Sequence, residues 1–331
     1  MFHYLIRRVM WAVVLFIAVT IVTYIIFYAI PANPARLACG QRATAECVKR
    51  AEHYLGTDKP LWFQYYKFFG RLMPFSVRGG PHLKEPSLGR SFTNRQSVNY
   101  TVGQAAPVTA SLVFGGVVFW MLIALPVGIL SALRPRSLLD RIAMVFVLIG
   151  ISAHPVWIGL IFVYFFSFKF GIFPISGYCD LINPSGSCGG PVQWAWHMIL
   201  PWITFSVLFA ALYVRMIRAN VMEASGEDYV RTARAKGAPE HVVIRSHILR
   251  NALLPVVTML GMDIGVALGG AIFTETIFSL PGLGQTAINA IANFDLPTVQ
   301  GIVVFATISI IVFNLVVDLL YAVIDPRIRL S

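Results

Sequence analysis

The side chains that could do chemistry in this 331-residue chain gather in a few short stretches between long apolar runs. The stretch from Tyr229 to Pro255 combines arginines, a lysine and histidines around Lys236-Gly237-Ala238-Pro239. Enzyme signatures such as H-E-x-x-H and G-x-S-x-G are missing, and no paired carboxylates lie at a common depth. We therefore predict no catalytic residue among these groups.

The sequence also contains no pattern for binding a nucleotide or a metal ion. The phosphate-cradling sequence G-x-x-x-x-G-K-[ST] does not occur, so any ATP hydrolysis must belong to another subunit. The cysteines show no C-x-x-C spacing, which argues against a metal site. We expect this chain to bind no cofactor of its own.

Composition places the chain in the membrane. It is 57% hydrophobic and 12% charged, whereas soluble domains carry about 25% charged residues. The formal net charge of +11 could suggest nucleic acid as a partner. In a membrane protein, however, lysine and arginine mark the loops that stay in the cytoplasm, so we expect lipid and no nucleic acid.

Six apolar stretches are long enough to cross a bilayer, which takes roughly 20 residues. The first follows Arg7 and Arg8 like a signal peptide, but its apolar run is too long, so we expect an uncleaved span. The fold class is therefore an all-α polytopic membrane protein with six transmembrane helices, namely Val9–Ile30, Val102–Leu133, Ile142–Phe168, Val192–Val214, Ala252–Thr274 and Leu296–Val317.

The short connections set the orientation. Arginine and lysine surround the second-to-third and fourth-to-fifth connections, whereas Gly171–Pro191 and Glu275–Asp295 contain neither residue. Both termini are therefore predicted to be cytoplasmic. The resulting division is a first helix at 1–31, a long extracytoplasmic loop region at 32–101, and a five-helix core at 102–331 that includes a cytoplasmic coupling segment at 222–250.

The four cysteines support this orientation, because all of them fall in predicted outside loops. Disulfides persist in oxidising compartments. We predict the local bridges Cys39–Cys47 and Cys179–Cys188; free thiols or a bridge between the two loops are the alternatives.

The basic connector itself has helix signals. Tyr229 to Lys236 favours helix, Gly237 suits a left-handed stop, and Pro239 followed by Glu240 suits the start of a second helix. A plain connector that grips anionic headgroups is one interpretation. The alternative is a docking element. A short loop would be enough to join the two spans, so a long ordered connector indicates that another molecule docks there.

At this point a family resemblance becomes specific. Asp228 to Gly237 resembles the cytoplasmic loop of bacterial ATP-binding-cassette (ABC) import permeases, in the form found in peptide importers. Other stretches resemble the membrane subunit of B type in the dipeptide/oligopeptide permease family, and they run along nearly the whole chain: Ile30–Arg36, Leu55–Phe69, Glu275–Gly284 and Asp318–Arg329. The stretch from Pro74 to Pro86 is a departure, being richer in Gly, Pro and Arg than the family usually is.

The resemblance implies a type I ABC importer permease fold in the bacterial inner membrane, and a set of partners. These are a second permease subunit of C type, two ABC ATPase subunits that use ATP and Mg, and an extracytoplasmic solute-binding protein. It also implies that the connector docks on the ATPase. Gly237 would make the turn, Ala233 and Ala235 would permit close approach, and three residues would make polar contacts at the rim, namely Arg231, Arg234 and Glu240.

Two further sets of residues are candidates. Glu275, Pro281, Gly282 and Gly284 would form a partly re-entrant scoop at the outer mouth; a simple outside turn is the alternative. Asp263 lies within a predicted span, where charges are functional hypotheses by default. It either faces the translocation path or is a structural partner of a neighbouring helix.

The function implied is half of the translocation pathway of an ATP-driven peptide importer. Relatives of this type also carry nickel chelates and other small solutes, so these remain alternatives. An ion-coupled secondary transporter is a rival of another class. It would need paired intramembrane ionisable groups and often internal repeats, which the sequence does not show.

Overall fold

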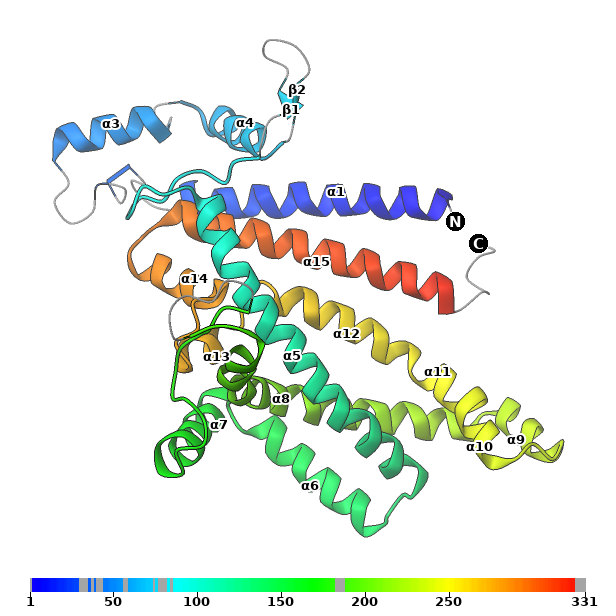
Figure 1. Cartoon of the computed structure of the whole chain (residues 1–331). Helices are drawn as coiled ribbons and strands as arrows, with labels where there is room; N and C mark the ends of the chain where they lie inside the picture. Colours follow the sequence, from blue (N-terminus) through cyan, green and yellow to red (C-terminus); the bar gives the residue numbers. More distant parts are fainter. Residues whose placement is uncertain are drawn as a thin grey trace. The chain divides into compact units, whose positions relative to one another are not determined.

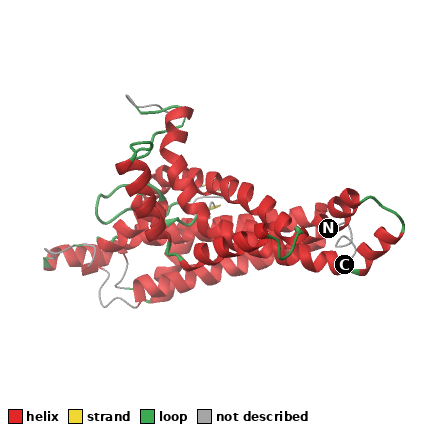
Figure 2. Cartoon of the chain, turned by 90° about the horizontal axis from the view of Figure 1, so that it is seen from below, coloured by secondary structure: helices red, strands yellow, loops and turns green. Residues whose placement is uncertain are grey.

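The computed structural model describes residues 2–29, 35–36, 39, 44–55, 59–73, 75–76, 82–83, 86–181 and 188–324. The stretches Ile30–Arg36 and Pro74–Pro86 and the end of the chain after Ile324 lie largely outside the described residues. Figure 2 shows that helix dominates the described part. The described part also contains a short hairpin, in which β1 (Phe75–Ser76) pairs antiparallel with β2 (His82–Leu83), and an isolated antiparallel bridge between Arg90 and Ser97.

The helices follow the predicted apolar runs (Figure 1). In chain order they are α1 (Phe2–Tyr24), η1 (Ile25–Ala29), α3 (Ala45–Leu55), α4 (Leu61–Leu72), α5 (Val98–Leu133), α6 (Leu138–Ser152), α7 (Pro155–Phe162), η3 (Val163–Lys169), α8 (Pro191–Gly226), α9 (Asp228–Ala235), α10 (Glu240–Val242), η4 (Val243–Leu249), α11 (Arg250–Ala252), α12 (Leu254–Ala267), α13 (Ile272–Ile277), α14 (Leu283–Ala292) and α15 (Leu296–Ile324).

Among the described residues, four helices are long and apolar enough to span a membrane: Ile6–Phe27, Val98–Leu133, Pro191–Gly226 and Leu296–Leu319. Two bent helix pairs bring the number to six if each pair is one span. The first pair, Leu138–Ser152 with Pro155–Lys169, bends by 104° within the predicted third span. The second pair, Glu240–Ala252 with Leu254–Ala267, bends by 43° where the connector meets the predicted fifth span.

The sharper bend has a local cause. His154 caps the second helix of the pair, because its Nδ1 accepts a hydrogen bond from the Val156 amide at 3.3 Å. Pro155 occupies the first helical position, where its missing N–H costs nothing. The His154 ring also packs edge-on against Phe273, with 5.0 Å between ring centroids. His154 is thus a packed polar residue at a helix break.

The described chain divides into two compact units. The larger unit contains residues 110–267, 273–280 and 313–331, and α8 lies at its centre. The α8 residues Tyr213, Ile217 and Val221 are almost completely buried. On α5, Gly115 and Gly116 lie against Trp202 and Phe205 of α8, so that a Cβ on Gly115 would come within 2.1 Å of the Trp202 ring. These small residues therefore serve packing within the chain.

The other unit contains residues 1–109, 268–272 and 281–312. Its polar centre is Asp295, a buried carboxylate just before α15. Asp295 accepts hydrogen bonds from the Ser91 hydroxyl at 2.5 Å, the Phe92 amide at 2.8 Å and the Thr298 hydroxyl at 2.7 Å. The end of the first loop is thereby fastened to the start of the last long helix.

We predict that Asp295→Ala destabilises the protein. Hydrogen bonds to a charged group contribute about 1.5–3 kcal/mol each, and the substitution leaves buried donors without their acceptor. A loss of about 3 kcal/mol or more is expected, measured as a lower thermal unfolding midpoint of the purified protein in detergent. Asp180→Ala is the control, because the Asp180 side chain is exposed; equal midpoints for the two variants would contradict the prediction.

Candidate functional site

The basic connector forms the helix–turn–helix that its sequence predicted. Helix α9 ends at Ala235, and Gly237 follows with a φ of +79°, in the left-handed region. The Gly237 amide donates to the Arg234 carbonyl at 2.9 Å, and the Ala238 amide donates to the Ala233 carbonyl at 3.2 Å. These two bonds form a Schellman motif, which satisfies carbonyls left open at a helix end.

The second helix of the connector begins at the predicted proline. Pro239 is the N-cap residue of α10, and the helical path continues through η4 and α11 to Ala252. Figure 1 shows α9, α10 and α11 together as one local group. The connector is therefore ordered helix over nearly its whole length.

An exposed ion pair joins the two arms of the turn. Arg234 donates from Nε and Nη2 to the two carboxylate oxygens of Glu240, at 3.1 and 2.7 Å. The hydrogen bond from Arg234 lowers the pKa of the Glu240 carboxyl. Exposed pairs are screened by solvent and stabilise little. This pair instead sets the relative direction of the two arms and places both charges at the rim of the turn.

One face of the connector belongs to the protein's own core. Val230 and Ala233 are buried in the same cluster as Val221, Val243 and Ile248. Ala233 therefore packs inward in this chain, and its expected role in close approach to another subunit stays a prediction. Ala235 and Gly237 lie on the exposed side with Arg231. The surface available for docking is thus smaller than the sequence pattern implied.

A buried ion pair that the sequence analysis missed holds α8 near the start of this connector. Arg218 donates from Nε and Nη2 to the two carboxylate oxygens of Asp140, at 2.7 and 3.0 Å. The Ser131 hydroxyl and the Arg136 amide donate to the same carboxylate. The Asp140 side chain is only 7% exposed. The pair therefore joins α8 to α6, to the end of α5 and to the turn between them.

A second polar contact fixes the same part of α8. Asn220 donates from Nδ2 to the Ala252 carbonyl at 3.3 Å, at the end of the connector. Arg218 and Asn220 both come from α8, within two turns or so of its end at Gly226. Any displacement of the connector must therefore be passed to α6 and α8 or break these bonds.

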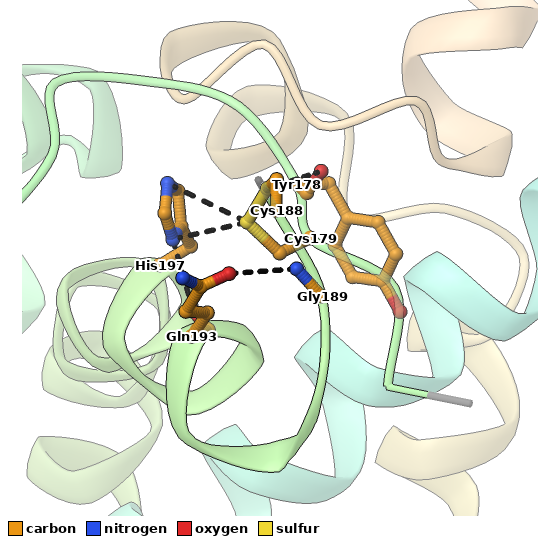
Figure 3. Close-up of a disulfide and its surroundings, with 6 residues drawn as sticks. All are labelled: Tyr178, Cys179, Cys188, Gly189, Gln193 and His197. Atoms are coloured by element: carbon orange, nitrogen blue, oxygen red, sulfur yellow. Dashed lines mark hydrogen bonds between the residues drawn. A yellow bond between two sulfur atoms is a disulfide. The ribbon is translucent and has the colours of Figure 1, made fainter. Parts of the chain in front are cut away.

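Both expected disulfides are formed, joining Cys39 to Cys47 and Cys179 to Cys188. Figure 3 shows the second one beside His197. Sulfur and imidazole ligand atoms of these three residues lie within 4.8 Å of one another, which is close enough to suggest a metal site. Metal binding by cysteine needs thiolates, however, and sulfurs bonded to each other cannot supply them.

Hydrogen bonds hold the loop around this disulfide. The Gly189 amide donates to Oε1 of Gln193 at 2.7 Å, which fastens the loop to the first turn of α8 (Figure 3). The Gly177 amide donates to the Phe278 carbonyl at 3.0 Å. The disulfide loop thereby supports the segment that contains Glu275, one of the predicted scoop residues.

Of the predicted scoop residues, Glu275 and Gly284 lie in the short helices α13 and α14, and Pro281 and Gly282 lie in the connection between these helices. Glu275 is fully buried in α13, and its carbonyl accepts from the Leu280 amide at 2.8 Å. Pro281 and the extended Gly282 precede α14, and Gly284 packs so closely on Ile272 that a Cβ would come within 2.8 Å of its Cα. Glu275 belongs to the larger compact unit and the other three residues to the other unit, and their common role at the outer mouth stays a prediction.

Asp263 has a partner on a neighbouring helix. The Tyr213 hydroxyl of α8 donates to the Asp263 carboxylate of α12 at 2.7 Å. This is the contact that a structural role requires. A place on the translocation path stays a prediction.

Long apolar helices and an ordered polar connector define a multi-pass membrane protein of the transporter-subunit class. The comparison with known proteins gives the family. A family model described as the binding-protein-dependent transport system inner membrane component matches residues 124–330, and the model of its N-terminal part matches residues 1–113. The chain belongs to this family, whose members are the membrane permease subunits of ABC importers with the type I permease fold.

Curated relatives match over nearly the full length. The dipeptide transport system permease protein DppB of Escherichia coli K12 is 36% identical over 347 aligned residues, with 99% of each chain covered. The di/tripeptide transport system permease protein DppB of Pseudomonas aeruginosa UCBPP-PA14 is 37% identical, again with 99% of each chain covered. A probable D,D-dipeptide transport system permease protein of E. coli K12 is 35% identical over 99% of this chain and 98% of its own.

We predict that Asp140→Ala lowers the free energy of unfolding by about 3 kcal/mol. Removing one partner of a buried pair leaves an uncompensated charge, which costs about 3–5 kcal/mol, and the partial exposure of Arg218 favours the lower end. Thermal unfolding of the purified protein measures the loss. Asp228→Ala removes the carboxylate of the exposed Arg231–Asp228 pair and should leave the midpoint unchanged. If both variants unfold at the wild-type temperature, the pair does not anchor α8.

Proposed function

We propose that this chain is the permease subunit of an ATP-driven ABC importer whose cargo is peptides, either dipeptides or oligopeptides. The chain would form half of the translocation pathway. One observation carries the peptide assignment: relatives at 35–37% identity, matched over nearly their whole length, are named as dipeptide or di/tripeptide permeases. The partners proposed are a second permease subunit of C type, two ATPase subunits that use ATP and Mg, and an extracytoplasmic solute-binding protein.

The connector from α9 to α11 is the proposed contact with the ATPase. Support comes from its architecture, because a docking element must be exposed at its tip and rigid at its base. The tip carries the Arg234–Glu240 pair and Gly237, while Val230 and Ala233 hold the base in the core. Arg231, Ala235 and Glu240 would then contact the ATPase surface directly.

The proposed location is the bacterial inner membrane, with both termini in the cytoplasm. The connector then lies on the cytoplasmic side, where its basic residues agree with the positive-inside rule. Both disulfides then lie on the outer side, in the compartment where such bonds persist.

The scoop residues keep their proposed place at the outer mouth, next to the solute-binding protein. The disulfide loop supports this assignment, since it braces the segment before Pro281 through the Gly177–Phe278 hydrogen bond. Nickel chelates or another small solute remain the alternative cargo.

Gly237→Val tests the coupling role. Valine would be strained at a φ of +79°, although open space surrounds the position, so the turn and the direction of α9 should change while the core stays intact. We expect normal amounts of protein in the membrane and a strong loss of uptake per ATP hydrolysed.

Gly226→Val is the matched control, because Gly226 also has open space around it but no positive φ. Uptake should persist in this variant. Normal ATP-coupled uptake by Gly237→Val would argue strongly against the docking role.

Uptake assays test the cargo and the energy source. Cells that lack this chain should lose uptake of a labelled dipeptide supplied at low concentration, and deletion of the ATPase should have the same effect. Uptake that survives ATPase deletion but stops with a protonophore would favour an ion-coupled secondary transporter. If cells that lack this chain lose uptake of a nickel chelate but keep uptake of the dipeptide, the cargo is the nickel chelate and not a peptide.

A further inference from the structure

Helix α4, in the first outside loop, packs against the first membrane span (Figure 1). The Tyr24 hydroxyl donates to Oε1 of Gln64 at 3.0 Å, and the hydroxyls of Thr20 and Tyr65 lie 3.0 Å apart. The Tyr24 ring also lies 5.5 Å from the ring of Phe68, centroid to centroid. All of these residues belong to the same compact unit. The contacts fix the depth of α4 relative to α1.

That depth is within the membrane boundary. The first candidate span runs from Ile6 to Phe27, and Thr20 lies seven residues before its end. At 1.5 Å per residue this is about 10 Å along the helix axis. Helices that lie in the membrane surface bury their apolar face by about 5–10 Å into the boundary between headgroups and acyl chains. An element that reaches Thr20 from the side must therefore enter this layer.

The side of α4 that does not contact α1 contains aromatic and apolar side chains, which are typical of the boundary between headgroups and acyl chains. Trp62, Tyr66 and Phe69 follow at i, i+4 and i+7, which places them in one stripe, and Met73, the C-cap residue just after the helix, continues its spacing. Trp62 is 71% and Tyr66 is 72% exposed. The stripe is distinct from the face formed by Gln64 and Phe68, which is buried. Helix α4 thus has two apolar faces, and α1 accounts for only one of them.

The charges of α4 lie away from the stripe. By helical position, Lys67 and Arg71 lie about 140° and about 180° around the helix from Trp62, so both are outside the stripe, and α4 contains no acidic residue. Exposed Lys59 comes just before the helix, with its ammonium 4.7 Å from the centroid of the Phe63 ring. Tryptophan and tyrosine with flanking lysines are typical of helices at the lipid–water boundary, where the cations meet phosphate groups.

We propose that α4 is an interfacial helix that lies in the membrane surface beside α1. Its stripe of Trp62, Tyr66, Phe69 and Met73 contacts acyl chains, and Lys59 and Lys67 contact phospholipid headgroups. The loop between the first two spans is therefore not wholly in water: it returns to the bilayer at α4 and anchors the outer end of α1. This inference is independent of the cargo and of the ATPase contact.

The test measures the depth of single positions in the full-length chain, reconstituted in vesicles of phosphatidylethanolamine and phosphatidylglycerol. Trp62→Cys, Tyr66→Cys and Lys67→Cys are each labelled with the fluorophore NBD; the four native cysteines are paired in disulfides and do not react. All three positions are exposed, so the labels leave the packing on α1 intact.

We expect nitroxide groups on the lipid acyl chains to quench the label at positions 62 and 66, and aqueous iodide to leave it unaffected. The label at position 67, on the same helix, should show the reverse. Iodide quenching at all three positions would overturn the proposal. So would iodide quenching at 62 and 66 that is lost when the solute-binding protein is added, because the stripe would then be a protein-docking surface.

Discussion

The ion pair between Arg218 and Asp140 is the constraint on which the architecture of the larger unit depends. It brings three helices and a turn to one carboxylate, in a region where most other contacts are apolar and non-directional. Apolar packing alone would let α8 slide or rotate against α6 at small cost. The bidentate geometry of an arginine–carboxylate pair removes that freedom. The connector that continues from α8 therefore begins from a fixed position.

The sequence predicted the connector well because its signals are local. Gly237 and Pro239 restrict backbone angles at their own positions, so the stop of one helix and the start of the next could be read directly. The long apolar runs and the two cysteine pairs were predictable for similar reasons. The burial of Ala233 was not, because which face of a short helix is buried depends on Val243 and Ile248, which approach from later in the chain.

The misses have a common physical origin. Asp140 and Arg218 are 78 positions apart, and nothing in the sequence shows that they meet. The size of the bend in the third span could not be predicted, because an apolar run records what contacts lipid and not the direction of the backbone.

The Schellman turn at Gly237 has a consequence for how a complex would assemble. Its two backbone hydrogen bonds and the Arg234–Glu240 pair are internal to the connector, so the shape of this element does not wait for another molecule. Association with a preorganised element loses less conformational entropy than association with a segment that must fold on contact. The connector therefore has its final shape before any partner binds, and a partner would bind it as one rigid surface binds another.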